Sequence, residues 1–353
     1  MRPLFVVLFL LSLVPAAAMA ARPPSALDLR VDGLSTRALL TEPAIKLLDP
    51  ERQAAAVRRA HWTLIGFVLT QLFEAVALLY LWSSGGAARL RDWLRRRLQN
   101  EWNVRFAFGA MLALVARLAA FVPSFYLYRV DHALGVTSEL TRIWGLYWLL
   151  YTVLAMLVAG LIAAIVLWLA ARTHFWYLVT IAGVLAASVA WSYVSQSAQS
   201  QSLSGMTAGE IRYAQAFELG RIVQGDAVSI ALIEGGIIIV FSALAVVIAD
   251  RIGFRRDDDP LSRLAIVGAL LALVYLAAVP VRNATLRSYD FGDDAYAVTT
   301  TRDPAGAVRA LIRRGDQRMQ EVCPEPAAML FLYTTPGIGA RVAAINHVPS
   351  GCP

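Results

Sequence analysis

The chain has few charged residues and almost no lysine. Aspartate, glutamate, lysine and arginine make up 16% of its 353 residues, and Lys46 is the only lysine. Hydrophobic residues make up 58%, which is more apolar surface than a soluble domain needs to bury. This balance excludes an ordinary soluble domain and predicts a protein that crosses a membrane several times. The sequence contains neither an internal repeat nor a low-complexity linker.

The positive charge is carried almost entirely by arginine, and the formal net charge at pH 7 is +7. The arginines stand beside apolar segments rather than in basic patches interleaved with aromatic residues. Nucleic acid is therefore a poor partner, because proteins that bind it carry such patches. Arginines next to apolar segments instead indicate contact with the anionic headgroups of a lipid bilayer.

Cysteine is also scarce. The two cysteines, Cys323 and Cys352, both follow the last apolar segment. Two cysteines in one exported segment predict a disulfide bond. Two unrelated free thiols remain the alternative.

The N-terminus has the features of a secretory signal peptide, predicted over residues 1–20. Arg2 precedes an apolar run from Leu4 to Val14, and Ala18-Met19-Ala20 forms a small-residue cleavage site. That ending favours cleavage over retention as a membrane anchor. Residues 21–61 are then expected to form a polar N-terminal segment outside the cytoplasm.

Residues 62–281 contain the apolar segments, each close to the ~20 residues that a helix needs to cross the hydrocarbon core. Backbone groups in lipid must pair within the segment, so helices are expected. The predicted fold is all-α: a polytopic transmembrane bundle of about six spans, followed by a soluble α-helical segment at 282–353. The expected spans are Trp62–Ser83, Phe106–Tyr126, Gly145–Ala171, Phe175–Val194, Val228–Ala249 and Leu264–Val281.

Arginine placement predicts the orientation of the bundle. Arginines crowd the connections near residues 89–105 and 251–263, and Arg172 lies in the tight connection between them. Loops dense in arginine face the cytoplasm. The N-terminal segment, the region around Phe217 and the C-terminal segment are then periplasmic, in a bacterial inner membrane.

Three charged residues fall inside the predicted spans: Glu74, Arg117 and Glu234. A lone charge near the bilayer centre costs at least ~2.5 kcal/mol, so Glu74 and Arg117 are expected to form a structural ion pair. Glu234 has no obvious partner in the sequence. It could line a water-filled cavity, or its side chain could reach toward the membrane surface. A transporter would place charges in this way, although little else supports that function.

Histidine is scarce as well, with four residues at positions 61, 132, 174 and 347. Their spacing does not predict a metal site. Neither G-x-S-x-G nor S-x-x-K accompanies the available serines, so a serine hydrolase is not indicated. Thr207 and Glu210 form a capping-box pattern that predicts the start of a helix near 207–225. Within it, Phe217-Glu218-Leu219-Gly220-Arg221 stands where a zinc peptidase carries H-E-L-G-H.

Other stretches extend this similarity along the chain. Tyr289 to Ala297 resembles an E-x-x-A-D-x-x-A helix, with Asp290 at the position of a third metal ligand and Asp294 at that of a supporting aspartate. Thr335-Pro336-Gly337 and Arg341 resemble an H-P-x-x-x-x-R element, with threonine in place of histidine. Together with the order of the spans, these matches resemble the integral-membrane zinc metallopeptidases related to the CAAX prenyl protease. The substantial soluble segment that this family places before its metal-binding helix is much shorter in this chain.

This resemblance implies a zinc site, which the substitutions are predicted to have abolished. Phenylalanine offers no lone pair, and arginine is a permanent cation that repels a metal. Glu218 then occupies the position of a general base without a metal-bound water to activate. We expect no cofactor, and we expect Arg221 to bridge to Asp290 or Asp294 in place of the metal, with Arg341 nearby. An Arg221 side chain that points into water is the alternative.

The predicted function is a non-catalytic membrane protein on a peptidase scaffold. Its partners would be the lipid bilayer and a hydrophobic peptide or another membrane protein, such as an active relative that it regulates. A working membrane metalloendopeptidase with an unrecognised metal site is the first alternative. A small-molecule or ion transporter is the second.

Overall fold

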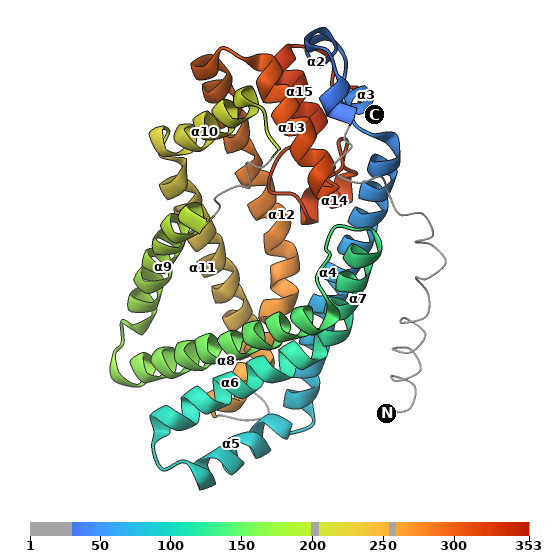
Figure 1. The fold of residues 1–353 in the computed structure, drawn as a ribbon. Helices are drawn as coiled ribbons and strands as arrows, with labels where there is room; N and C mark the ends of the chain where they lie inside the picture. Colours follow the sequence, from blue (N-terminus) through green and yellow to red (C-terminus); the bar gives the residue numbers. More distant parts are fainter. Residues whose placement is uncertain (1–29, 199–204, 254–258, 353) are drawn as a thin grey trace.

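The computed structural model describes residues 30–198, 205–253 and 259–352. These residues are predominantly α-helical, and within these three ranges there is no β-strand, which confirms the all-α prediction. The predicted signal peptide at residues 1–20 lies outside the described residues. Four long helices, α4 (Pro50–Ser83), α8 (Thr141–Arg172), α11 (Asp226–Gly253) and α12 (Pro260–Thr301), form most of the elongated body in Figure 1.

Among the described residues, five helices are long and apolar enough to cross a membrane: α4, α6 (Glu101–Ala119), α8, the Val228–Ile252 part of α11, and α12. They coincide with five of the six predicted spans. The remaining predicted span, Phe175–Val194, is also helical and belongs to α9 (Trp176–Ala198). The apolar part found there covers Trp176–Ala190, which is shorter than a full span.

The predicted second span, Phe106–Tyr126, is wrong at its C-terminal end. Helix α6 ends at Ala119, and a separate helix, α7 (Phe121–Ala133), begins after Ala120. Pro123 explains the break, because a proline ring collides with the carbonyl of the residue four positions earlier and supplies no N–H. The second span is therefore α6 alone.

Two other boundaries also differ from the sequence prediction. Helix α4 begins at Pro50, where the Asp49 side chain accepts from the backbone N–H groups of Glu51 and Arg52. Helix α12 continues through Pro280 to Thr301, so the expected boundary at residue 281 falls inside one helix. The arginine-rich connection after the first span is not a loop but helix α5 (Gly86–Arg97).

Helices α6 and α8 pack through small residues. A Cβ atom on Gly109 would lie 2.6 Å from the Cβ of Ala163, and one on Gly160 would lie 2.7 Å from the carbonyl oxygen of Phe106. The two backbones therefore approach closely, as is common in lipid, where small side chains rather than large apolar ones bring helices together.

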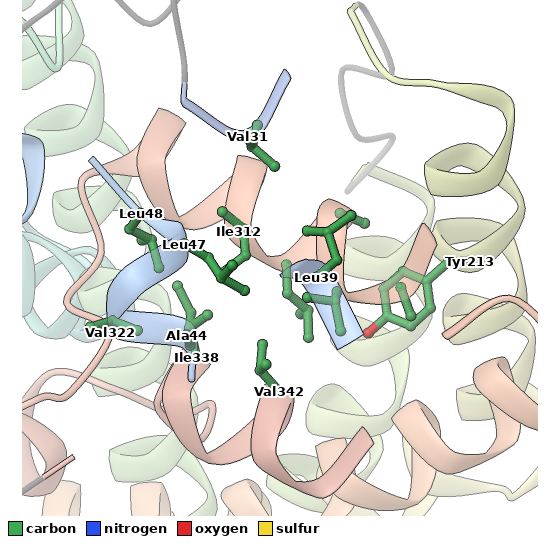
Figure 2. Close-up of a cluster of buried hydrophobic side chains, with 14 of the residues drawn as sticks. Val31, Leu39, Ala44, Leu47, Leu48, Tyr213, Ile312, Val322, Ile338 and Val342 are labelled. Atoms are coloured by element: carbon green, nitrogen blue, oxygen red, sulfur yellow. The ribbon is translucent and has the colours of Figure 1, made fainter. Parts of the chain in front are cut away.

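A compact group of short elements covers one end of the long helices (Figure 1). We call it the cap, and it consists of η1 (Arg30–Gly33), α2 (Thr36–Thr41), α3 (Ala44–Leu47), α10 (Ala208–Val223), α13 (Pro304–Arg318) and α15 (Ile338–Asn346). Figure 2 shows that aliphatic side chains from segments far apart in sequence meet in its core, with Leu39, Leu47, Ile312 and Val342 among them. Helix α14 (Pro326–Phe331) lies between the cap and α4.

The disulfide predicted from the two cysteines is confirmed. Cys323 and Cys352 are bonded, with their Cα atoms 5.4 Å apart. The bond joins the segment after α13 to the C-terminal end of the described chain. It therefore closes the cap around α14 and α15.

Candidate functional site

Helix α10 carries the Phe217 motif, and its start is held as the sequence predicts. The Thr207 hydroxyl accepts from the Glu210 N–H at 3.5 Å, and the Glu210 carboxylate accepts from the Thr207 N–H at 2.5 Å, which forms a capping box. Glu210 is fully buried and also accepts from Arg313 Nε at 2.7 Å. Arg313 in turn donates to Asp32, so η1, α10 and α13 share one charge network.

Phe217 and Arg221 lie next to each other on one face of α10, as their spacing requires. The guanidinium carbon of Arg221 lies 4.9 Å from the centre of the Phe217 ring. The guanidinium carbon of Arg341, from α15, lies 5.1 Å from the same ring. Phe217 is 4% exposed and belongs to the cap core. An apolar ring flanked by two cations therefore fills the space in which the resemblance expects a metal ligand.

Arg221 bridges α10 to α12. Its Nη2 donates to Asp290 Oδ1 at 2.9 Å, and its Nε donates to Asp293 Oδ2 at 3.2 Å. Asp290 is one of the two carboxylates that the sequence named as partners, and Asp293 is a partner that it did not name. Both aspartates are buried, whereas Arg221 is partly exposed. The bridge therefore neutralises carboxylates that could not remain charged alone at such low exposure.

Asp294, the other named carboxylate, binds Arg341 instead. Arg341 Nε donates to Asp294 Oδ2 at 2.8 Å and its Nη2 donates to Oδ1 at 2.7 Å, which is the bidentate geometry that arginine and carboxylate favour. The Tyr213 hydroxyl also donates to Asp294 Oδ1. All three side chains are almost completely buried, so this second bridge ties α15 and α10 to α12 inside the cap.

The carboxylates around Arg221 keep some unused acceptor capacity. Within the described part of the chain, Asp226 Oδ2, Asp290 Oδ2 and Asp293 Oδ1 are buried oxygens without a hydrogen-bond partner. Burial alone would lower the pKa of Arg221, but the neighbouring charges of Asp290 and Glu218 raise it overall. Arg221 is thus a fixed cation within a carboxylate-rich cluster.

The two other predicted residues of this site are Glu218 and Thr335. Glu218 is half-buried on the same helix and lies close enough for its charge to act on Arg221. Thr335 accepts from Gln320 Nε2 at 3.5 Å, in the segment between α14 and α15. Thr335 thus bonds to Gln320 and not to either of the two arginine bridges.

The donor set around Arg221 does not fit the zinc site that the resemblance implies. A catalytic zinc needs three protein donors and an open position. Here the two expected imidazole positions hold a phenyl ring and a guanidinium, and the guanidinium already contacts Asp290. Across residues 30–198, 205–253 and 259–352, no three histidine, cysteine, aspartate or glutamate side chains are grouped so that they could hold a metal ion.

The intramembrane charges are arranged differently from the prediction. Arg117 is close enough to Glu74 to interact electrostatically, but in the described structure the two do not form an ion pair. The Arg117 guanidinium lies instead over Trp148 of α8, at 5.9 Å from the ring centre. Glu234, for which the sequence offered no partner, accepts from Arg282 of α12 at 2.8 Å.

Three partners found in the structure were missed by sequence reasoning. Asp293 could have been found, because it stands three residues after Asp290 and so shares a helical face with it. Tyr213 could also have been found, because it stands one turn before Phe217 on α10. Arg282 could also have been found, because it directly follows the last predicted span, and consecutive antiparallel spans bring it to the same end of the bundle as Glu234.

Comparison with known proteins identifies one partial similarity. The chain is 31% identical over 161 residues to a protease HtpX homolog from Albidiferax ferrireducens. The aligned region covers 42% of this chain and 55% of that protein, so the chain spans about half the length of this relative. No family model matches, and no solved structure matches. The similarity supports a membrane-metallopeptidase-like relation.

Proposed function

We propose that the chain is a non-catalytic membrane protein on a metallopeptidase-like scaffold. One observation carries this proposal: Arg221, at an expected metal-ligand position, contacts both Asp290 and Asp293. A guanidinium there supplies the positive charge and the crosslink that a metal would supply, but it cannot activate water. Phe217 strengthens the proposal, because it is part of the cap core.

The family branch, the membrane and the task that we propose for the chain rest on the sequence motifs. Under this proposal the chain is a degenerate relative of the CAAX-protease-related peptidases, in a bacterial inner membrane, with the cap on the periplasmic side. Its task would be to bind a hydrophobic peptide or another membrane protein, for example an active relative that it regulates. The retained Asp294 and Arg341, together with Asp290 in place of the glutamate of the motif, support common descent, because each stands at a motif position that a peptidase would use.

Metal analysis of the purified protein tests the proposal directly. The protein would be extracted in a mild detergent, its zinc content measured, and its cleavage of an unfolded protein substrate followed with and without a chelator. We expect neither stoichiometric zinc nor chelator-sensitive cleavage. Stoichiometric zinc together with cleavage that the chelator abolishes would overturn the proposal.

A gain-of-metal variant tests the inferred geometry separately. The double substitution Phe217→His and Arg221→His restores two imidazoles on one helical face opposite Asp290. We expect this variant to bind zinc, whereas Phe217→His alone, which keeps the guanidinium, should bind much less. If the double variant folds and binds no zinc, the assignment of Arg221 and Asp290 to ancestral metal positions is wrong.

A double-mutant cycle tests the bridge itself. Arg221→Met and Asp290→Asn would be compared singly and together for their effect on the free energy of unfolding. Because the two groups share one contact, we expect a coupling energy of roughly 0.5–3 kcal/mol. Arg212 and Asp290 provide a matched control, because Arg212 lies on the same helix but contacts Asp303 instead. Additive losses in both cycles would show that the bridge does not replace a metal crosslink.

A working metalloendopeptidase is the second candidate, and the similarity to a protease favours it. Glu218 is retained at the general-base position, and buried oxygens of Asp290 and Asp293 still lack donors. The same metal and cleavage assays separate the two candidates. Loss of chelator-sensitive cleavage in Glu218→Gln would support the working enzyme, and absence of any such cleavage in the unmodified protein would support the non-catalytic one.

A further inference from the structure

A cavity of about 370 Å³ lies between α4, α7, α12 and the segment that contains the end of α14. Its walls are mainly apolar, with Phe67 from α4, Leu127 from α7, and Tyr275 and Val279 from α12. Phe331 completes this wall. The Phe67 ring centre lies 6.0 Å from that of Tyr275 and 6.4 Å from that of Phe331. This volume is at the lower end of the range typical of small-molecule sites.

The cavity lies where the apolar parts of the helices end. The apolar run of α12 stops at Val281, and both Arg282 and Asn283 line the cavity directly after it. On the neighbouring helices, Trp62 of α4 and Tyr126 of α7 form an edge-to-face pair at 5.7 Å. Tryptophan and tyrosine gather at the boundary between hydrocarbon and water. A bilayer boundary at this pair would put the apolar wall at the depth of the hydrocarbon and Arg282 at the level of the headgroups.

Arg282 has capacity for a second anionic partner. Its Nε and Nη2 both contact a single oxygen of Glu234, at 2.8 and 2.5 Å, and its side chain is 36% exposed. A guanidinium has five N–H donors, so this ion pair does not exhaust them. The pair also holds the guanidinium in place, since Glu234 comes from α11 and Arg282 from α12.

We propose that this cavity binds one acyl chain of a glycerophospholipid from the surrounding bilayer, with the lipid phosphate at Arg282. An acyl chain needs no hydrogen bonds. The lining also includes Thr63, Thr70 and Thr334, and the Thr70 hydroxyl already donates to the Gly66 carbonyl at 2.8 Å. A peptide segment would bring backbone N–H and C=O groups that need partners in such a place. Asn283, the amide at the rim, already donates to the Leu330 carbonyl at 2.9 Å. An acyl chain with an anionic headgroup therefore fits both the apolar walls and the single cation.

Photo-crosslinking in vesicles tests the acyl-chain part. The full-length protein would be reconstituted in phosphatidylcholine vesicles with a trace of phosphatidylglycerol that carries a diazirine on one acyl chain. We expect the label to concentrate on the peptides that contain Phe67, Tyr275 and Phe331. Labelling no stronger there than on α8, whose Leu149 and Tyr151 are openly exposed, would overturn the proposal.

A cavity-filling variant makes this test specific. Val279→Trp places an indole in the cavity and should lower labelling of the cavity peptides about tenfold, as expected when a buried acyl contact is lost. Val240→Trp is the matched control, because Val240 is 64% exposed on α11. If Val279→Trp does not fold, as judged by its melting temperature, Leu127→Phe takes its place. Unchanged labelling in a folded cavity-filling variant would contradict the proposal.

Charge variants test the headgroup part and the source of the acyl chain. Labelling would be competed with unlabelled phosphatidylglycerol, phosphatidylcholine, free palmitate or a hydrophobic peptide. Arg282→Gln should weaken competition by phosphatidylglycerol about fivefold. Glu234→Gln should strengthen it about as much, because the amide oxygen can still accept from the guanidinium while the negative charge beside the phosphate is removed. Palmitate or the peptide competing better than phosphatidylglycerol would overturn the proposal, as would equal competition in both variants.

Discussion

The cap and the membrane-spanning helices bury polar and charged groups in different ways. In the cap, buried charges pair with opposite charges at two places, where Glu210 binds Arg313 and Asp294 binds Arg341, although both carboxylate oxygens of buried Asp316 have no hydrogen-bond partner in the part of the chain that the structure describes. In the bundle, the buried Nε of Arg117 has no hydrogen-bond partner among the described residues, and the guanidinium lies over Trp148. Large aliphatic side chains fill the cap core, whereas α6 and α8 meet through glycine and alanine.

This difference follows from the solvent that each region faces. In water, burying aliphatic side chains drives folding, and a buried charge is tolerated only with a partner. In lipid, apolar side chains gain nothing by leaving the solvent, so helices associate through close backbone contact. The candidate site lies at the border between the two regions, because Arg221 reaches from the cap to α12. It follows the rule for water, in which a buried charge needs a partner.

Breaking the buried arginine bridge in the cap should have the largest effect. Arg341→Met leaves Asp294 buried without its bidentate partner, which should cost about 3–5 kcal/mol of unfolding free energy. The comparison is Arg282→Met, which breaks a partly exposed pair with Glu234 and should cost about 1 kcal/mol or less. Thermal unfolding of both variants in one detergent measures the difference, and equal losses would remove the contrast between the regions.

Removing the disulfide should have the next largest effect. The bond joins residues separated by 29 positions, so its loss frees a loop of that length in the unfolded chain. Replacing Cys323 and Cys352 by serine should cost about 3–4 kcal/mol. Reduction of the unmodified protein should reproduce this loss, and the cap should then unfold before the bundle. Simultaneous unfolding of both regions would mean that the cap and the bundle unfold as one cooperative unit.

Crowding the helix contact in the bundle should have a smaller effect. Gly109→Val places a side chain against Ala163 and the carbonyl of Ala159, and overpacking of this kind costs about 1–3 kcal/mol. Gly236→Val is the control, because a Cβ atom there meets nothing within 4 Å. Unfolding in urea measured by tryptophan fluorescence compares the two. A loss no larger for Gly109→Val would show that close backbone approach does not stabilise the bundle.

The sequence was sufficient where the physical cause is local. Thr207 and Glu210 predicted a capping box because both partners lie within one helical turn, and long apolar runs predicted the spanning helices. The proximity of Arg221 to Asp290 could be expected only through the family resemblance, because the two are far apart in the chain. Helical spacing on one face would have added Asp293 to the same cluster.

The sequence was insufficient where the outcome depends on which neighbours a helix meets. Arg117 was expected to pair with Glu74, but its guanidinium lies over an aromatic ring of α8 instead. The effect of a proline was equally dependent on context. Pro123 follows the end of α6, whereas Pro280 lies within the continuous helix α12. A single rule for proline could not have predicted both outcomes, since neighbouring helices can satisfy the backbone groups that a proline frees.

The smallest effect concerns a buried acid beside the cap that does not belong to an arginine bridge. Glu321 is 2% exposed, and its carboxylate accepts from the Tyr333 hydroxyl at 3.1 Å. Burial raises its pKa to about 7, and the charge of Glu325 adds to the rise against the hydrogen bond from Tyr333. Because the folded protein then holds a proton that the unfolded chain releases at lower pH, stability should fall as the pH rises toward 7.

The loss between pH 6 and pH 8 should be about 1 kcal/mol, with little further change above pH 8. Glu321→Gln removes the titrating group and should flatten this part of the stability curve. Asp316→Asn is a useful comparison, because burial raises the pKa of Asp316 to about 6. As the pH rises, the stability that protonated Asp316 contributes should therefore be lost at a lower pH than that of Glu321. A curve for Glu321→Gln as steep as that of the unmodified protein would show that the charge at Glu321 is compensated, as it is in the arginine bridges.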